Sequence, residues 1–303
     1  MILYGTNPIA WTNDDDWSIG AHLSLGDCLS DCREIGFDGI EKGHLMPEEG
    51  TELKAVLGGY GLRFAAGWFS TNLLANDLET EVARLRDWIA FTRAAGGDHI
   101  NACECSNTVH GNDAVAVNDR PVLTDAEWGR FSMGYEELSR VAREEGVAMG
   151  YHHHMGTIVE SEEDIHRFME MAGPHTRLLL DTGHAWFGGA DPAELARRYM
   201  DRVSHIHAKN VRPGVARQVR EEGLSFLEGV RRGAFTVPGD DEGAVDFAPV
   251  LEAAAGQGYE GWLVIEAEQD SAVRDPKHYQ ALGLRSLKRI AAEAGLDRAR
   301  APV

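Results

Sequence analysis

The feature that most constrains the fold is a repeated alternation of short apolar runs with helix-like segments. The runs are rich in Val, Ile, Leu and Ala without strict alternation, which is typical of parallel strands covered on both faces. Most of them recur at intervals of roughly 30 residues, the length of one strand–helix unit. The eight runs are PIAW, FDGIE, LRFAAGWFS, GDHINAC, GVAMGYH, RLLLD, VSHIH and GWLVIE.

The segments between the runs carry the punctuation of helices. In TDAEWGRFSMGYEELSRVAREEG, for example, Thr124 and Glu127 have the spacing of a capping box. Eight such units, with no GxGxxG fingerprint after the first run, predict an α/β fold of the (β/α)8 TIM-barrel type and not an open doubly wound sheet. Residues 1–303 then form a single domain, with active-site loop insertions at about 106–122 and 210–245.

The charge of the chain restricts its partners. Asp and Glu number 49 against 29 for Lys and Arg, which gives a net charge of −20. Such a field repels phosphate backbones and anionic lipid, so neither nucleic acid nor a membrane is expected as a partner. No segment approaches the roughly 18 apolar residues of a membrane helix, and the first residues lack the features of a secretion signal. We expect a cytoplasmic protein with reduced thiols that can form a homo-oligomer.

Metal-ligand side chains stand at the ends of several predicted strands. The carboxyl ends of barrel strands meet at one rim, so these side chains are expected to share a site. Each of them alone would more often have a structural role. Two imidazoles and two carboxylates suit a divalent cation such as Mn²⁺, Co²⁺, Fe²⁺ or Zn²⁺. The strand-end residues are Glu41, His152, Asp181, His207 and Glu266.

The run YHHHMGT contains three consecutive histidines. The period of two along a strand points His152 and His154 to one side and His153 to the other. We therefore assign His152 to the metal and His154 to substrate or proton transfer, and we expect His153 to pack outside the barrel wall. In LLLDTGHAW, the flexible Gly183 permits a turn that brings His184 over the mouth, although a capping histidine remains the alternative.

The run SHIHAKN repeats this logic on the next strand. His205 and His207 share a face, and His207 lies nearer the rim and is therefore the better ligand, while His205 is expected in the core. Lys209 follows as a cation that can face developing negative charge. In WLVIEAEQD, Glu266 is the strand-end carboxylate, and Glu268 is expected to support a ligand or to face solvent.

The motifs WTNDD, YHHHMGT, LLLDTGHAWFGGADP, HIHAKNVRP and FTVPGD resemble the myo-inosose-2 dehydratase family of bacterial inositol catabolism. That family lies within the xylose-isomerase-like superfamily of TIM barrels, and the resemblance spans about residues 9–269. It implies a divalent cation, Mn²⁺ or Co²⁺, held at the ends of strands five to eight by His152, Asp181, His207 and Glu266. The first of these departs from the usual carboxylate. The resemblance also implies glutathione as a cofactor, for which the sequence offers no recognisable site.

The reaction implied by the resemblance is removal of water from scyllo-inosose (2-keto-myo-inositol) to give 3D-trihydroxycyclohexane-1,2-dione. The cation would polarise the ketone and make the neighbouring C–H bond acidic. Glu266 or His154 would then remove the carbon-bound proton, and His184 or His154 would protonate the leaving hydroxyl. Lys209 would support the negative charge that develops.

Three further residues are candidates for binding ring hydroxyls. Asn13, Glu41 and Trp68 stand at or just beyond the ends of the first three predicted strands, with Trp68 as a flat apolar floor or, alternatively, a packing residue. The same metal ligands would serve a keto-sugar or inosose isomerase or epimerase, which stays the alternative function. A barrel-type DNA-repair endonuclease would need a basic face, which the charge opposes. A non-catalytic inositol-binding module would not need the strand-end ligands.

Overall fold

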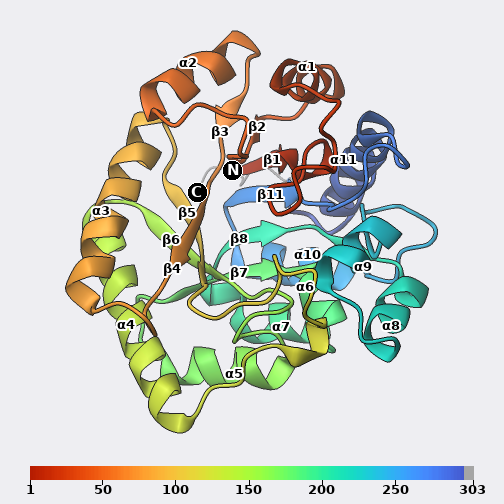
Figure 1. The fold of residues 1–303 in the computed structure, drawn as a ribbon. Helices are drawn as coiled ribbons and strands as arrows, with labels where there is room; N and C mark the ends of the chain where they lie inside the picture. Colours follow the sequence, from red (N-terminus) through yellow and green to blue (C-terminus); the bar gives the residue numbers. More distant parts are fainter. Residues whose placement is uncertain (297–303) are drawn as a thin grey trace.

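The strands form one curled parallel sheet with helices around its outside (Figure 1). The computed structural model describes residues 1–296, and the last seven residues of the predicted domain lie outside the described range. Within it, the nine strands of this sheet follow the order β3-β2-β1-β11-β8-β7-β6-β5-β4. This arrangement confirms the (β/α)8 TIM barrel that the sequence predicts.

The elements follow one another in strand–helix alternation. The sheet consists of β1 (Ile2–Thr6), β2 (Gly39–Ile40), β3 (Arg63–Phe64), β4 (Trp68–Thr71), β5 (His99–Glu104), β6 (Ala148–His152), β7 (Arg177–Asp181), β8 (Val203–His207) and β11 (Gly261–Ile265). The helices are α1 (Leu25–Ile35), α2 (Gly50–Gly59), α3 (Leu78–Ala94), α4 (Asp125–Glu144), α5 (Glu162–Met171), α6 (Thr182–Phe187), α7 (Pro192–Tyr199), α8 (Pro213–Glu221), α9 (Phe226–Arg232), α10 (Ala248–Gln257) and α11 (Pro276–Glu293). A separate antiparallel pair is formed by β9 (Asn210–Val211) and β10 (Phe235–Thr236).

The third predicted run is a bent strand that closes the ring. It divides into β3 and β4, with residues 65–67 between them. The carbonyl of Ala66 accepts a hydrogen bond from the amide of Lys42 beside β2, at 2.9 Å. The carbonyl of Gly67 accepts one from the amide of Asn101 on β5, at 3.0 Å. The bend therefore joins both edges of the sheet, and this one sequence run gives two strands.

The prediction of a strand at PIAW is wrong. These residues form a 3-10 helix, Pro8–Ala10. The first strand is β1, which ends at Thr6, five residues before the end of the PIAW run at Trp11. The side chain of Asn7 accepts a hydrogen bond from the amide of Ile9 at 2.9 Å and begins the helical turn, while a proline offers no amide for a sheet ladder. The chain therefore reaches the rim at Asn7, and Asn13 lies in a loop beyond it.

The two long connections pack together above the carboxyl ends of the strands. Residues 106–122 contain a 3-10 turn, and residues 210–245 contain α8, α9 and the β9–β10 pair. The amide of Val117 donates to the carbonyl of Leu224 at 2.9 Å. Both connections contribute to an apolar cluster separate from the barrel core, which includes Ile19, Val117, Met155, Val211, Phe226 and Phe235. The two connections thus form a joint roof over the rim.

Helix starts follow the caps that the sequence indicates. The side chain of Thr124 accepts a hydrogen bond from the amide of Glu127, and the side chain of Glu127 accepts one from the amide of Thr124, so the predicted capping box of α4 is confirmed. Ser24 and Ser161 begin α1 and α5 in the same way. Among the helices within residues 1–296, none combines the length and the apolar character needed to cross a bilayer.

Candidate functional site

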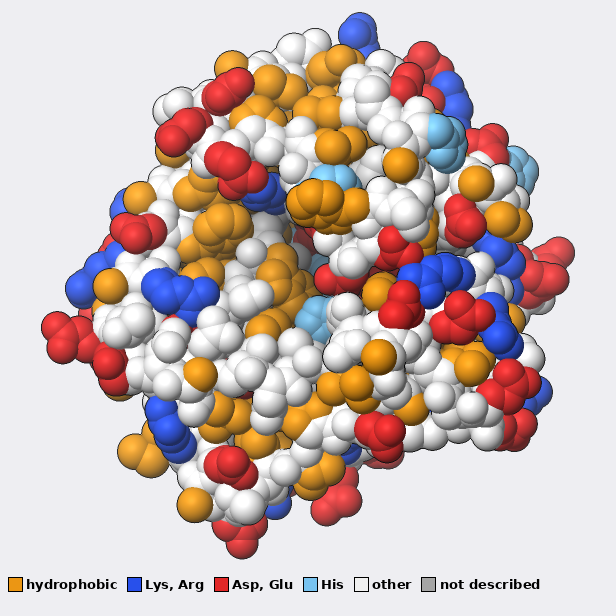
Figure 2. All heavy atoms as spheres, viewed as in Figure 1, with side chains coloured by type: hydrophobic (Ala, Val, Ile, Leu, Met, Phe, Trp, Pro, Cys, Tyr) orange, Lys and Arg blue, Asp and Glu red, His pale blue; other side chains and the backbone are white. Residues whose placement is uncertain are grey.

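A cavity of about 140 Å³ opens at the carboxyl ends of the strands. Figure 2 shows the hollow at the centre of this face, with acidic and histidine side chains at its wall and apolar ones at its rim. Its walls come from strand ends and from loops alike. The lining residues are Asn7, Ile9, Asp14, Asp15, Glu41, Lys42, Trp68, Asn101, His110, His154, His207, Glu266 and Glu268.

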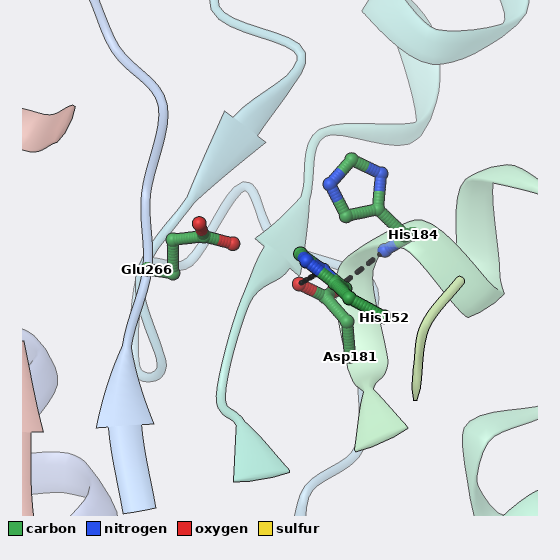
Figure 3. Close-up of side chains that lie close together, drawn as sticks. All are labelled: His152, Asp181, His184 and Glu266. Atoms are coloured by element: carbon green, nitrogen blue, oxygen red, sulfur yellow. Dashed lines mark hydrogen bonds and ion pairs between the residues drawn. The ribbon is translucent and has the colours of Figure 1, made fainter. Parts of the chain in front are cut away.

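The four predicted metal ligands come together at the bottom of this cavity. Nε2 of His152 lies 3.3 Å from Oδ2 of Asp181, and Nδ1 of His207 lies 3.4 Å from that oxygen and 3.0 Å from Oε2 of Glu266. Atoms bound to one ion at about 2.1 Å lie about 3.0 to 3.4 Å from each other. Figure 3 shows Glu266 reaching across from the β11 side towards His152 and Asp181. These buried groups therefore fit a divalent cation.

A fifth possible donor, His184, lies beside this group. One group of possible ligand atoms, all within 4.8 Å of one another, comes from His152, Asp181, His184 and Glu266. The two ring nitrogens of His184 both face donors, the amide of Met155 3.3 Å from Nδ1 and Nζ of Lys209 2.8 Å from Nε2, so the one lone pair of the neutral ring is already in use. Nδ1 of His207, by contrast, faces two carboxylates. This geometry favours His207 over His184 as a ligand.

Glu41 fixes the orientation of His207. Oε1 of Glu41 lies 3.1 Å from Nε2 of His207 and 2.8 Å from Nε2 of His205, and it accepts a hydrogen bond from Asn101 at 2.8 Å. Its other oxygen accepts one from Asn7 at 2.7 Å. A carboxylate behind a ligating histidine commonly sets its tautomer in this way. With Nε2–H donated to Glu41, Nδ1 of His207 is left for the cation site.

Lys209 is buried inside the same cluster. Its Nζ lies 2.8 Å from Oε2 of Glu266, 3.2 Å from Oε1 of Glu268 and 3.7 Å from Oδ2 of Asp181. The side chain is completely enclosed. Lys209 therefore neutralises part of the negative charge that these carboxylates concentrate, and it holds their oxygens towards one point.

The charged side chains of this cluster stay ionised although they are buried. Burial alone would raise the pKa values of Asp181 and Glu266. Lys209 and the neighbouring histidines outweigh this effect, so the pKa of Asp181 lies well below its usual value and the pKa of Glu266 is lowered to about 2. Burial acts in the opposite direction on His207, yet the negative charges of Glu41 and Glu266 raise its pKa well above the usual value. The site thus keeps its carboxylates ionised and gathers positive charge between them.

His154 lines the cavity beside the cation site, with its ring centroid 5.4 Å from that of His152. Its Nδ1 lies 2.8 Å from the carbonyl of Met155, so Nδ1 carries the proton, and Nε2 faces Oε1 of Glu268 at 3.8 Å. Burial lowers the pKa of His154, but the contact with Glu268 outweighs it and raises the pKa. His153 is also buried, and its Nε2 faces the backbone amide of Asp181 at 3.3 Å.

The residues predicted to bind substrate occupy different places. Trp68 lines the cavity and presents its ring to His152 and His154, with centroids 5.4 and 5.8 Å apart. Glu41 also lines it, with partners on both oxygens. Asn13 is not among the lining residues that the structure describes, and its Oδ1 instead accepts hydrogen bonds within its own loop.

Sequence reasoning missed six lining residues with polar side chains, among them Lys42, which directly follows Glu41. Asn7 and Asn101 carried a strand-end signal, since one follows β1 and the other lies in β5, but the displaced first strand concealed Asn7. Asp14, Asp15 and His110 come from loops, where no periodicity indicates which way a side chain points. The WTNDD motif marks two of these residues without showing their direction.

Comparisons with known proteins place the chain among similar barrels. The family model described as xylose isomerase-like TIM barrel matches residues 29–290. The rhizopine catabolism protein MocC of Rhizobium meliloti is 41% identical over 289 residues, 95% of this chain and 88% of that protein. An inosose dehydratase of Yersinia enterocolitica is 38% identical over 287 residues, 94% of this chain and 96% of that protein. The solved structure of the IolI protein with a bound zinc atom matches with a TM-score of 0.69 at 14% identity, covering 96% of this chain and 99% of that chain.

Proposed function

The chain belongs to the xylose isomerase-like TIM barrel family, among the relatives of the inosose dehydratases, and from this premise we propose that it is a hydro-lyase of inositol catabolism. It removes water from scyllo-inosose to give 3D-trihydroxycyclohexane-1,2-dione. Several proteins named inosose dehydratase support this assignment, at 36 to 40% identity over more than nine-tenths of the chain. The alternative of an isomerase or epimerase is not favoured, because the inosose dehydratases matched at this identity carry a hydro-lyase name.

The observation that carries the mechanism is the convergence of four donor atoms at one point. His152, Asp181, His207 and Glu266 would hold a divalent cation, with Mn²⁺ or Co²⁺ as the proposed ions and Glu41 behind His207. A cation bound there would draw electron density from a ketone oxygen and acidify the neighbouring C–H bond. A ring ketone with adjacent hydroxyls is the kind of substrate that such a site can bind through oxygen.

His154 is the proposed base for the carbon-bound proton. Because the carbonyl of Met155 holds the proton on Nδ1, the free atom is Nε2, which belongs to a residue of the cavity wall. Glu268 lies 3.8 Å from Nε2 and would stabilise the imidazolium that results. Glu266 is less suited to this step, since its Oε2 already contacts His207 and Lys209.

Lys209 and His184 support the site from behind. Burial lowers the pKa of Lys209, but the surrounding carboxylates outweigh this effect and raise it, so the ammonium persists and opposes the negative charge of the deprotonated substrate. His184 contacts Lys209 at 2.8 Å and lies against His154 with ring centroids 3.8 Å apart. It lies behind His154 as seen from the cavity, so we assign it to holding these two groups and not to protonating the leaving hydroxyl.

The substrate ring would lie in the cavity above these groups. Trp68 offers a flat apolar surface beside His152 and His154, which suits the carbon face of a cyclic polyol. Glu41 would meet a ring hydroxyl with the lone pairs that its protein partners leave. Asn13 would act indirectly, by fixing the loop that forms the opposite wall.

The test is turnover of scyllo-inosose by metal-reconstituted protein, followed by the absorbance of the conjugated dione. His152→Ala and Glu266→Ala are expected to lose bound metal and to lower turnover by at least about 100-fold, because each removes a ligand of the charge-stabilising ion. His166→Ala is the matched control, since His166 lies on α5 and hydrogen-bonds Tyr199 away from the cavity. Absence of dione with the unaltered protein would contradict the assigned reaction, and unchanged turnover in both variants would contradict the site.

A further inference from the structure

The acid that protonates the leaving hydroxyl is not supplied by the strand ends. His154 serves as the base, His184 lies behind it, and Glu266 faces the cation site. Two loop residues, Asp15 between β1 and α1 and His110 in the roof, face the same cavity from the opposite side. We call these two residues the loop wall.

The backbone at Asp15 is fixed from both sides. The buried side chain of Asn13 accepts hydrogen bonds from the amides of Asp15 and Asp16, each at 2.8 Å, and the amide of Asn13 donates to the carbonyl of Ile19 at 3.2 Å. Gly20 closes the loop with a φ of 80°, where a Cβ would collide with the carbonyl of Trp11. The loop therefore carries its aspartates in one conformation.

Asp16 anchors this loop to the roof. Its Oδ2 accepts a hydrogen bond from Arg231 of α9 at 2.6 Å, and the same guanidinium donates to both oxygens of Asp113 at 2.6 and 2.9 Å. Ser225 also donates to Asp113, at 2.9 Å. One arginine thus joins two loops that are distant in the sequence to α9 and keeps the loop wall over the cavity.

The carboxyl group of Asp15 remains available to a substrate. Within residues 1–296 its carboxylate takes no hydrogen bond, and the nearest ionisable partner is Nε2 of His110 at 3.8 Å. Its neighbour Asp14 is engaged instead, because its Oδ1 lies 2.7 Å from Nδ1 of His44 and accepts a hydrogen bond from the His44 amide at 3.1 Å. The Asp15 side chain keeps 31% of its surface exposed, so the group can exchange protons with solvent through the mouth.

The tautomer of His110 follows from its neighbours. The hydroxyl of Thr108 donates to the carbonyl of Gly156 at 2.9 Å, because a carbonyl can only accept. Thr108 must therefore accept from Nδ1–H of His110, with which it is in contact. Burial lowers the pKa of His110 to about 3, so the ring is neutral and Nε2 presents a lone pair towards Asp15.

The charges that face Asp15 favour its acid form. Partial burial is the largest cause and raises the pKa of this carboxyl group to about 6. The negative charges of Glu268, Asp14 and Glu266 act in the same direction, against the attraction of His154. A carboxylic acid with a pKa near the operating pH is suited to general acid catalysis.

We propose that Asp15 is the general acid of the dehydration and that His110 orients the hydroxyl that leaves. The hydroxyl donates its own hydrogen to Nε2 of His110 and accepts a hydrogen bond from the Asp15 carboxyl. When the C–O bond breaks, its electron pair stays on the oxygen, which takes the Asp15 proton and departs as water. The Asp15 carboxylate then regains a proton from solvent, and His110 stays neutral throughout. This proposal rests on the proposed dehydratase function.

The test separates C–H cleavage from C–O cleavage. Asp15→Asn is incubated with scyllo-inosose in D₂O, and formation of the dione is measured beside incorporation of deuterium at the carbon next to the ketone. We expect dione formation to fall about 10²- to 10⁴-fold, the usual range for loss of a general acid. Deuterium incorporation and bound metal are expected to stay within a few fold of the unaltered protein, because His154 and the cation ligands are intact.

Two further variants complete the experiment. His110→Phe keeps a ring against Trp68 and His154 but loses the acceptor, and dione formation is expected to fall about tenfold. Asp119→Asn, an exposed change in the same roof, is the control and is expected to match the unaltered protein. Equal loss of deuterium incorporation and dione formation in Asp15→Asn, or full dehydration by it, would overturn the proposal. Absence of dione from the unaltered protein would instead overturn the dehydratase function.

Discussion

The cavity has two walls that are built on different principles. The strand wall, formed by His152, Asp181, His207 and Glu266, follows strands whose register is fixed, with Asp181 opposite His207 in the β7–β8 ladder. Asp15 of the loop wall stands on a turn held by one asparagine and one arginine contact. Asp181 is fully buried, whereas 31% of the Asp15 side chain is exposed. The groups that we propose to share a cation are fixed by the sheet, and the group that we propose as the acid lies on a loop.

Among substitutions in the two walls, Asp181→Asn in the strand wall should have the largest effect on metal binding and activity. The asparagine oxygen can still accept from the amides of Gly183 and His184 and begin α6, as Asp181 does at 2.8 Å. The charge next to the cation is lost, so we expect bound metal to disappear and kcat/KM to fall by at least about 10³-fold, since the ion contributes several kcal/mol to charge stabilisation. Metal analysis and dione formation measure the two effects.

A chelator should reproduce this result with the unaltered chain. Removal of the ion is expected to abolish turnover and its return to restore it, while the Asp181→Asn protein should not recover with added Mn²⁺ or Co²⁺. Full activity after complete removal of metal would contradict the cation-dependent mechanism and leave the dehydratase assignment to other groups.

Lys209→Met should have the next largest effect, on stability. The substitution leaves Glu266 and Glu268 buried without their shared cation, which typically costs about 3 to 5 kcal/mol of unfolding free energy. Urea unfolding of the metal-free protein measures this loss. Added Mn²⁺ should recover part of it, because an ion that binds only the folded state stabilises that state.

Lys54→Met on α2 is the matched control for this change, since Lys54 is exposed. Its unfolding midpoint is expected to stay within error of the unaltered protein. A Lys209→Met protein that unfolds at the same urea concentration as this control would show that the carboxylates of the strand wall do not depend on Lys209.

Glu41→Gln should weaken the strand wall without removing a ligand. The amide oxygen of glutamine can accept from Nε2–H of His207, but the charge that orients the ring and strengthens Nδ1 is gone. Loss of such a supporting carboxylate typically lowers metal affinity about 10- to 100-fold. Titration with Co²⁺, followed by its absorption spectrum, gives the affinity, and an unchanged value would assign Glu41 to substrate alone.

The strand wall could be predicted from the sequence because strand ends converge in a barrel. The runs that contain His152, Asp181, His207 and Glu266 each end in a polar residue, and the period of two indicates the side on which His154 lies. The assignment of these residues to a metal stays a prediction until an ion is measured. So does the single domain, whose last seven residues lie beyond the described range.

The first strand and the loop wall could not be predicted in the same way. PIAW is as apolar as a strand, but the Asn7 cap and the proline turn it into a 3-10 helix, which competes locally with the sheet. Asp15 and His110 stand on two loops that Arg231 joins to α9, and a contact between distant loops leaves no periodic signal. The tautomer of His110 depends on Thr108 and could be assigned only from the geometry.

Arg231→Met tests whether the loop wall depends on its anchor, and it should have the smallest effect on stability. Like Lys209, Arg231 bridges carboxylates, but its side chain is 32% exposed. An exposed ion pair contributes about 0 to 1 kcal/mol, so the unfolding free energy should scarcely change. The loop wall should lose its anchor, however, and kcat/KM should fall about three- to tenfold through misplacement of Asp15.

Arg289→Met on α11 is the control for this substitution, because Arg289 forms an exposed pair with Glu293 away from the cavity. The loss in Arg231→Met should disappear when it is combined with Asp15→Asn, since an acid that is absent cannot be misplaced. Losses that multiply in the double variant would mean that Arg231 acts on the strand wall. The two walls would then be one mechanical unit, and the contrast between sheet-held ligands and a loop-held acid would fail.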